Sequence, residues 1–112
     1  MFEVETGVLA SAQAVGAIVV DVREPSEYAT GHVPGSRLIP SHEIRERLYE
    51  LPRGATLYLI CANGARSLDL IPFMRAVGYD AYSVAGGMWA WQTNALVEEG
   101  DGLPTSDVQE TP

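Results

Sequence analysis

The sequence contains a single cysteine, no lysine and no long apolar run, and each absence narrows what the chain can be. One cysteine cannot form an internal disulfide or a zinc cluster of several cysteines, so Cys61 acts only as a thiol or thiolate. No run of about 18 apolar residues is present to cross a bilayer, and the first residues lack the basic flank of a signal peptide. We therefore expect a cytoplasmic protein without a membrane partner.

Acidic residues outnumber basic ones by 15 to 7, which gives a formal net charge of −8. Because nucleic-acid binding depends on neutralising phosphates, nucleic acid is not an expected partner. The 112 residues, 46% of them hydrophobic, can bury the core of one domain without disulfides. We expect that domain at residues 1–100, followed at 101–112 by an acidic tail that is mobile.

Strand-like and helix-like segments alternate along the chain. Two apolar runs rich in β-branched and aromatic residues, 17–22 and 56–60, predict buried parallel strands. Shorter strands are predicted at 2–4, 37–39 and 81–84, and helices at 7–15, 25–29, 42–51, 67–77 and 88–97. The helix at 42–51 would turn Ile44, Leu48 and Leu51 toward the core, whereas Pro72 should kink or break the helix at 67–77. This alternation predicts the α/β class with a mainly parallel sheet.

Cys61 directly follows the strand at 56–60 and precedes a helix, which places it at the sheet edge where ligands gather. Residues 61–66 (CANGAR) form what we call the cysteine loop. Small side chains and Gly64 let this backbone curl so that successive N–H groups point at the sulfur. The helix that starts near Arg66 adds unpaired N–H groups and the positive end of its dipole.

A thiolate surrounded by such N–H groups should have a lowered pKa and be nucleophilic at neutral pH. The Arg66 fork would close the ring around a sulfonate-like or phosphate-like group. A free cysteine is more often a small buried hydrophobic residue, but a packing role requires neither the glycine nor the arginine. We therefore interpret Cys61 as the catalytic residue. The predicted substrate-binding residues are Ala62, Asn63, Gly64, Ala65, Arg66 and Ser67.

Other polar residues have simpler interpretations. Asp21 and Arg23 follow a strong strand and are candidate supporting residues, expected to form a structural ion pair in which Glu27 is a further partner of Arg23. His32 and His42 lack the neighbouring ligands that a metal site requires. No metal or other cofactor is therefore expected.

Several motifs in order resemble a rhodanese-like domain of the single-domain sulfurtransferase type. They are DVREPSEYATGHVPGS from Asp21, then CANGARS from Cys61, then Gly78-Tyr79, and finally Gly86-Gly87 with Trp91. The resemblance implies a five-stranded parallel sheet with helices on both faces. It also implies that Cys61 accepts sulfane sulfur from thiosulfate or a persulfide, and passes it through a persulfide intermediate to a thiol or cyanide.

Two alternatives remain open at this stage. The loop has the C-x4-R spacing of the family's sulfurtransferases, whereas the related phosphatases and arsenate reductases carry a loop one residue longer. That difference, together with the lack of a second cysteine, disfavours a phosphatase or arsenate reductase. The other alternative is a binding or sulfur-relay module that turns over no small donor and receives persulfide sulfur from a partner protein.

Overall fold

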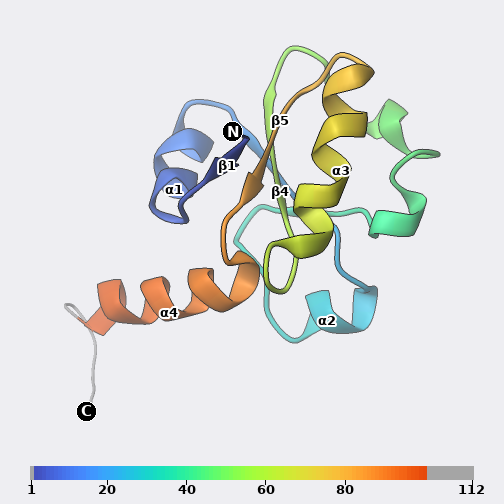
Figure 1. The fold of residues 1–112 in the computed structure, drawn as a ribbon. Coiled ribbons are helices and arrows are strands. Elements are labelled where there is room, and N and C mark those ends of the chain that lie inside the picture. Colours follow the sequence, from blue (N-terminus) through green and yellow to red (C-terminus); the bar gives the residue numbers. More distant parts are fainter. Residues whose placement is uncertain (1, 101–112) are drawn as a thin grey trace.

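A five-stranded parallel sheet forms the centre of the protein (Figure 1). The computed structural model describes residues 2–100, so the predicted tail at 101–112 lies outside the described residues. The strands are β1 (Glu3–Val4), β2 (Ile18–Asp21), β3 (Arg37–Leu38), β4 (Thr56–Ile60) and β5 (Asp80–Val84). Their order is β1-β5-β4-β2-β3, and every neighbouring pair is parallel. The predicted α/β class is confirmed, and β4 is the central strand.

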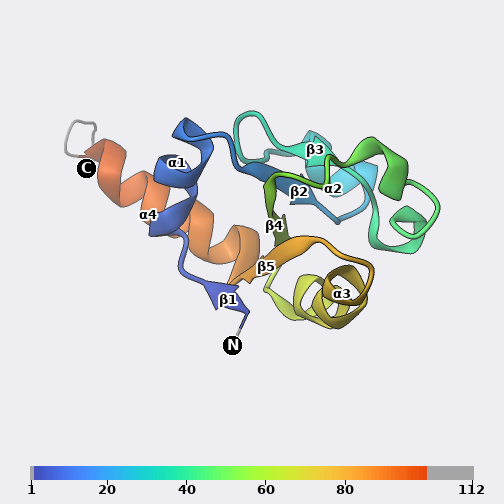
Figure 2. The same ribbon diagram turned by 90° about the horizontal axis from the view of Figure 1, so that it is seen from above.

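Helices cover both faces of this sheet. They are α1 (Gly7–Ala14), α2 (Pro25–Ala29), α3 (Ala65–Ala76) and α4 (Gly87–Gly100), with two 3₁₀ turns at Ser41–Glu43 and Leu48–Glu50. Seen from above, α1 and α4 lie on one face, while α3 and the 3₁₀ turns lie on the other (Figure 2). The sheet therefore has a buried core on each side, as expected for parallel strands.

Side chains of β4 alternate between the two cores, since successive residues of a strand point to opposite faces. Leu57, Leu59 and Cys61 belong to the apolar cluster under α3. Tyr58 and Ile60 belong to the cluster beneath α1 and α4. The alternation continues one residue beyond the strand, and it directs the Cys61 side chain toward the start of α3.

The predicted helix at 42–51 is wrong, because this segment forms two separate 3₁₀ turns. The prediction that its apolar residues face the core is confirmed, since Ile44 and Leu51 are buried and Leu48 packs against the same cluster. The Tyr79 hydroxyl donates to the carbonyls of Leu48 and Leu51 at 2.9 and 3.2 Å. The Leu48 carbonyl also accepts the N–H of Leu51 at 2.9 Å, so Tyr79 fastens the second 3₁₀ turn to the segment before β5.

The predicted break at Pro72 is also wrong. Helix α3 runs without interruption from Ala65 to Ala76, and Pro72 lies exposed on its outer side. Ile71 and Met74 flank the proline and are 2% and 0% exposed. Their burial holds the helix together, even though the proline has no N–H to offer the carbonyl of Leu68.

Replacing Pro72 with alanine should therefore stabilise the protein. The change restores a helical N–H donor and removes the clash of the ring with the preceding turn, although it also gives the unfolded chain more freedom. We expect a net gain of about 1 to 2 kcal/mol, measured as a higher midpoint of urea unfolding with an unchanged slope. A lower midpoint would show that the proline ring itself makes a stabilising contact.

Candidate functional site

The sulfur of Cys61 lies within a ring of hydrogen-bond donors. The N–H of Gly64 points at Sγ from 3.1 Å and the N–H of Ser67 from 3.4 Å. The Ser67 hydroxyl lies 3.5 Å from the same sulfur. Cys61 is 0% exposed, so a reactant reaches Sγ only when neighbouring atoms move. Although the Cys61 side chain belongs to the buried apolar cluster under α3, its sulfur is contacted by hydrogen-bond donors.

These donors lower the pKa of Cys61. Burial is the largest influence and raises the pKa of the thiol, because a charged sulfur loses hydration. The Ser67 hydroxyl and the N–H groups of Ser67, Gly64 and Asn63 act in the opposite direction and together outweigh burial. The thiolate fraction at neutral pH is therefore larger than for an ordinary cysteine, which makes Cys61 a good nucleophile.

The cysteine loop takes its shape from Gly64 and Asn63. Gly64 precedes α3 with φ +96°, a left-handed conformation in which a side chain would be strained. A Cβ there would also come within 3.1 Å of the Gly86 nitrogen. The Asn63 side-chain oxygen accepts the N–H of Ala65 at 3.0 Å, and this closes the turn.

The start of α4 holds the same loop from outside. The N–H of Met88 donates to the Cys61 carbonyl at 2.7 Å, and the N–H of Trp89 donates to the Ala62 carbonyl at 3.1 Å. Gly87 permits this approach, since a Cβ on it would collide with the backbone of Cys61 and Ala62. The predicted strand at 81–84 and helix at 88–97 leave Gly86-Gly87 between them, but they do not indicate that this turn packs on the loop.

A second serine lies behind the first. The hydroxyls of Ser67, on α3, and Ser83, on β5, are 2.7 Å apart, and both residues are 0% exposed. Ser67 also lies 3.3 Å from the Gly64 carbonyl. Sequence reasoning missed Ser83, although a hydroxyl in the middle of a buried strand is a usable signal, since such groups need a partner.

Arg66 does not reach the sulfur. Its Nη2 lies 3.5 and 3.4 Å from the two carboxylate oxygens of Glu27, and among the described residues it has no other ion pair. The expected interaction of Glu27 with Arg23 is present only as an electrostatic influence that raises the pKa of Arg23, and the ion pair of Glu27 is with Arg66. The Glu27 carboxylate thus engages the guanidinium that was expected to close the ring around Cys61.

The predicted ion pair of Asp21 with Arg23 is confirmed. Three hydrogen bonds of 2.8 to 3.2 Å join the guanidinium to the carboxylate, and the guanidinium also donates to the Gly31 carbonyl at 2.8 Å. Asp21 is 0% and Arg23 5% exposed. The hydrogen bond to Asp21 is the largest influence on Arg23 and raises its pKa. The pair fixes the chain just after β2, beside the cysteine loop.

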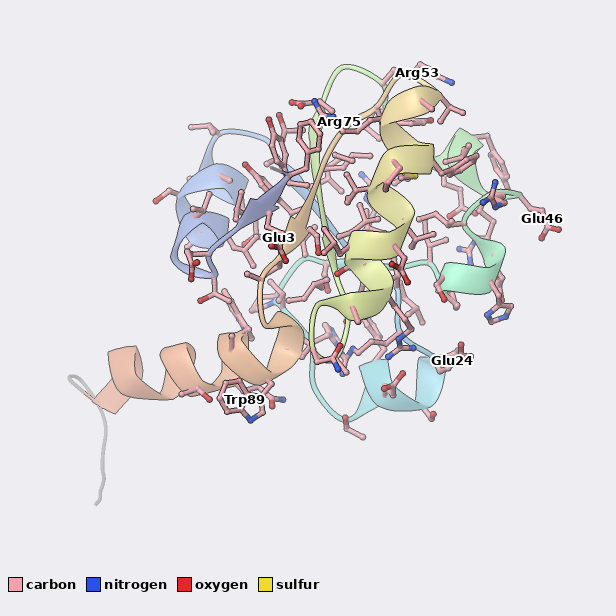
Figure 3. The ribbon with its side chains drawn as sticks, in the orientation of Figure 1. Glu3, Glu24, Glu46, Arg53, Arg75 and Trp89 are labelled. Atoms are coloured by element: carbon pink, nitrogen blue, oxygen red, sulfur yellow. The ribbon has the colours of Figure 1, made fainter. Side chains whose placement is uncertain are left out.

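Two hollows flank the loop. The larger, about 420 Å³, lies between α2 and the start of α4 and includes Glu27, Ala62 and Trp89 in its lining. Trp89 is 72% exposed and stands out from α4 on the side away from the sheet (Figure 3). The smaller hollow, about 240 Å³, is lined by Ser41, His42, Arg66, Asp69 and Leu70. Together they give reactants two approaches to the loop.

The two histidines lie apart from the sulfur. His32 stacks on Tyr28 with ring centroids 3.6 Å apart, and His42 lies between Glu24 and Glu43 at 3.4 and 3.5 Å. Within residues 2–100 no group of three or more metal-ligating side chains comes together. In the same part of the chain, no helix is long and apolar enough to span a bilayer.

Comparison with known proteins places this site in context. A family model described as a rhodanese-like domain matches residues 6–94. A protein of Pseudomonas fluorescens named thiosulfate sulfurtransferase GlpE is 32% identical over 90 residues, which cover 80% of this chain and 83% of that protein. A protein of the same name from Pseudomonas paraeruginosa is 35% identical over 79 residues, covering 70% and 72%.

Solved structures agree with the sequence matches. A rhodanese-related protein from Thermoplasma volcanium aligns with a TM-score of 0.77 at 30% identity, covering 93% of this chain and 96% of its own. A rhodanese-like domain protein from Staphylococcus aureus aligns with a TM-score of 0.75 at 34% identity, covering 81% and 91%.

Removing the Ser67 hydroxyl should raise the pKa of Cys61, because a hydrogen bond to the charged form is lost. In Ser67→Ala the rate of alkylation by iodoacetamide should therefore rise at higher pH than in the wild type. Ser83→Ala, which removes the partner of Ser67, should shift the profile in the same direction but less. Ser11→Ala, an exposed change on α1, serves as the control. An unshifted profile for Ser67→Ala would contradict this account of the thiolate.

A methyl group at Gly87 should push α4 away from the loop. We expect Gly87→Ala to lower the free energy of unfolding by about 2 kcal/mol or more, since it adds both a backbone clash and a left-handed alanine. Chemical denaturation measures the loss. Gly54→Ala is the matched control, because nothing lies within 4 Å of a Cβ there. Equal stability of the two variants would mean that the contact between the cysteine loop and α4 can rearrange at little cost in free energy.

Proposed function

This chain belongs to the rhodanese-like domain family, and we propose that it is a sulfurtransferase in which Cys61 carries sulfane sulfur as a persulfide. One observation supports this above all: the Cys61 sulfur accepts N–H groups from Gly64 and Ser67 at 3.1 and 3.4 Å. Such a setting stabilises a negatively charged sulfur before and after transfer. The curated relatives, named thiosulfate sulfurtransferase, support a rhodanese-type enzyme.

The first half-reaction loads the cysteine. The Cys61 thiolate attacks the outer sulfur of thiosulfate or of an organic persulfide, and a new S–S bond forms to Cys61. The old bond to that sulfur breaks, and its electron pair leaves with sulfite or with the donor thiolate. The terminal sulfur of the persulfide is then the anion held by the backbone N–H groups of residues 62–67. Arg66 receives the anionic end of the donor.

The second half-reaction unloads it. A thiolate or cyanide attacks the terminal sulfur, the bond to Cys61 breaks, and the electron pair returns to the Cys61 thiolate. The donors around Sγ act in both halves, because each begins or ends with charge on this sulfur. Asp21 and Arg23 support the reaction indirectly by fixing the end of β2. Ala62, Asn63 and Ala65 contribute backbone and the surface that a reactant meets.

The decisive experiment incubates the protein with thiosulfate and measures its intact mass by mass spectrometry. The wild type should gain one sulfur atom, and Cys61→Ser should gain none while keeping the same circular-dichroism spectrum. Cyanide should then remove the sulfur and yield an equal amount of thiocyanate. A folded wild type that gains no sulfur from thiosulfate or from cysteine persulfide would overturn the proposal. Loading only by a protein persulfide, such as that of a cysteine desulfurase, would favour a relay module.

A further inference from the structure

Arg66 is the last residue of the cysteine loop, and its guanidinium contacts Glu27. Nη2 alone makes the contact, at 3.4 and 3.5 Å from the two carboxylate oxygens. The Arg66 and Glu27 side chains are 40% and 37% exposed, so the pair is open to water and to competing ions. An ion pair of this length and exposure is weak. An incoming anion can therefore bind Arg66, but the anion must compete with Glu27 for the guanidinium.

Glu27 is the fixed member of this pair. Its carboxylate accepts the N–H of Glu24 at 2.9 Å, which caps the start of α2. The hydrogen bond from Glu24 is the largest influence on Glu27 and lowers the pKa of its carboxyl, and Arg66 lowers it further. The carboxylate is thus ionised at neutral pH and held by the Glu24 N–H, whereas Arg66 extends on a flexible stem.

Charges of both signs surround this pair: Arg23 lines the larger hollow with Glu27 and lowers the pKa of its carboxyl, whereas an acid lies beside Arg66 in the smaller hollow. Asp69 lines the same hollow, and His42 in that hollow lies between the carboxylates of Glu24 and Glu43. Glu24 lies at the start of α2 (Figure 3). A dianion such as thiosulfate meets this group of acids as well as Arg66. An organic persulfide of low net charge meets a smaller electrostatic penalty.

From these contacts we propose that Glu27 determines donor specificity by competing with anionic donors for Arg66. The proposal rests on the sulfurtransferase function proposed above. Glu27 disfavours the thiosulfate dianion and shifts the preference of the site toward organic persulfides of low net charge. It acts on donor binding through Arg66 and takes no part in the attack of Cys61 on sulfur.

Glu27→Gln is the direct test, because the amide oxygen can still accept the Glu24 N–H while the charge is removed. The kcat/KM for thiosulfate, with cyanide as acceptor, reports the donor half-reaction. We expect it to rise about two- to fivefold through a lower KM, with kcat unchanged. The kcat/KM for cysteine persulfide should stay the same.

Two further variants separate competition from a general charge effect. Asp69→Asn removes one negative charge from the smaller hollow, which Arg66 also lines. The Asp69 carboxylate has no ion pair with Arg66 among the described residues, so the change should alter kcat/KM less than twofold. In an Arg66→Ala background, Glu27→Gln should give no gain. A gain of equal size without Arg66, or no gain in Glu27→Gln alone, would overturn the proposal.

The outcomes also distinguish this proposal from the one on which it rests. Intact-mass measurement of each variant, after exposure to thiosulfate and separately to cysteine persulfide, shows whether sulfur is transferred at all. If Cys61 gains sulfur and Glu27→Gln leaves kcat/KM for thiosulfate unchanged, only the specificity role of Glu27 fails. If no variant gains sulfur from either donor, the sulfurtransferase function fails and the role of Glu27 fails with it.

Discussion

The hydrogen bonds from the first turn of α4 to the carbonyls of Cys61 and Ala62 are the constraint on which the site depends. A peptide unit that turns its carbonyl outward can turn its N–H inward, so these bonds help to aim the following N–H groups at the sulfur. Gly87, the first residue of α4, allows the backbone of this helix to come this close. The thiolate is therefore stabilised by the packing of one helix against a loop that is distant in sequence.

Much of the fold could be predicted because its signals are local. The strand at Thr56–Ile60 has an uninterrupted apolar run, and its observed bounds equal the predicted ones. The prediction failed at residues 42–51 because 3₁₀ turns and an α-helix can bury the same apolar residues, so the apolar spacing alone does not distinguish them. Likewise, the local tendency of Pro72 to break a helix was outweighed by the packing of α3 on the sheet.

The candidate site divides in the same way. Cys61 and the curled loop follow from a strand, a glycine and a helix that are neighbours in sequence. Ser83 and Glu27 lie 16 and 39 residues away from the loop residues they contact, and no local pattern connects them. The ion pair of Arg66 with Glu27 could not be predicted from the loop alone, because a charged side chain can choose among partners. That choice depends on where α2 packs, which the sequence of the loop does not contain.

The position of β1 at one edge of the sheet affects the order in which parts of the chain can fold. β1 pairs only with β5, and the N–H of Ser83 donates to the carbonyl of Phe2. This join spans most of the chain, and closing so long a loop costs entropy before any contact rewards it. During synthesis on the ribosome, β1 must wait for β5, and the cysteine loop for α4. The hydrogen bonds that hold the cysteine loop are therefore complete only after α4 has been synthesised.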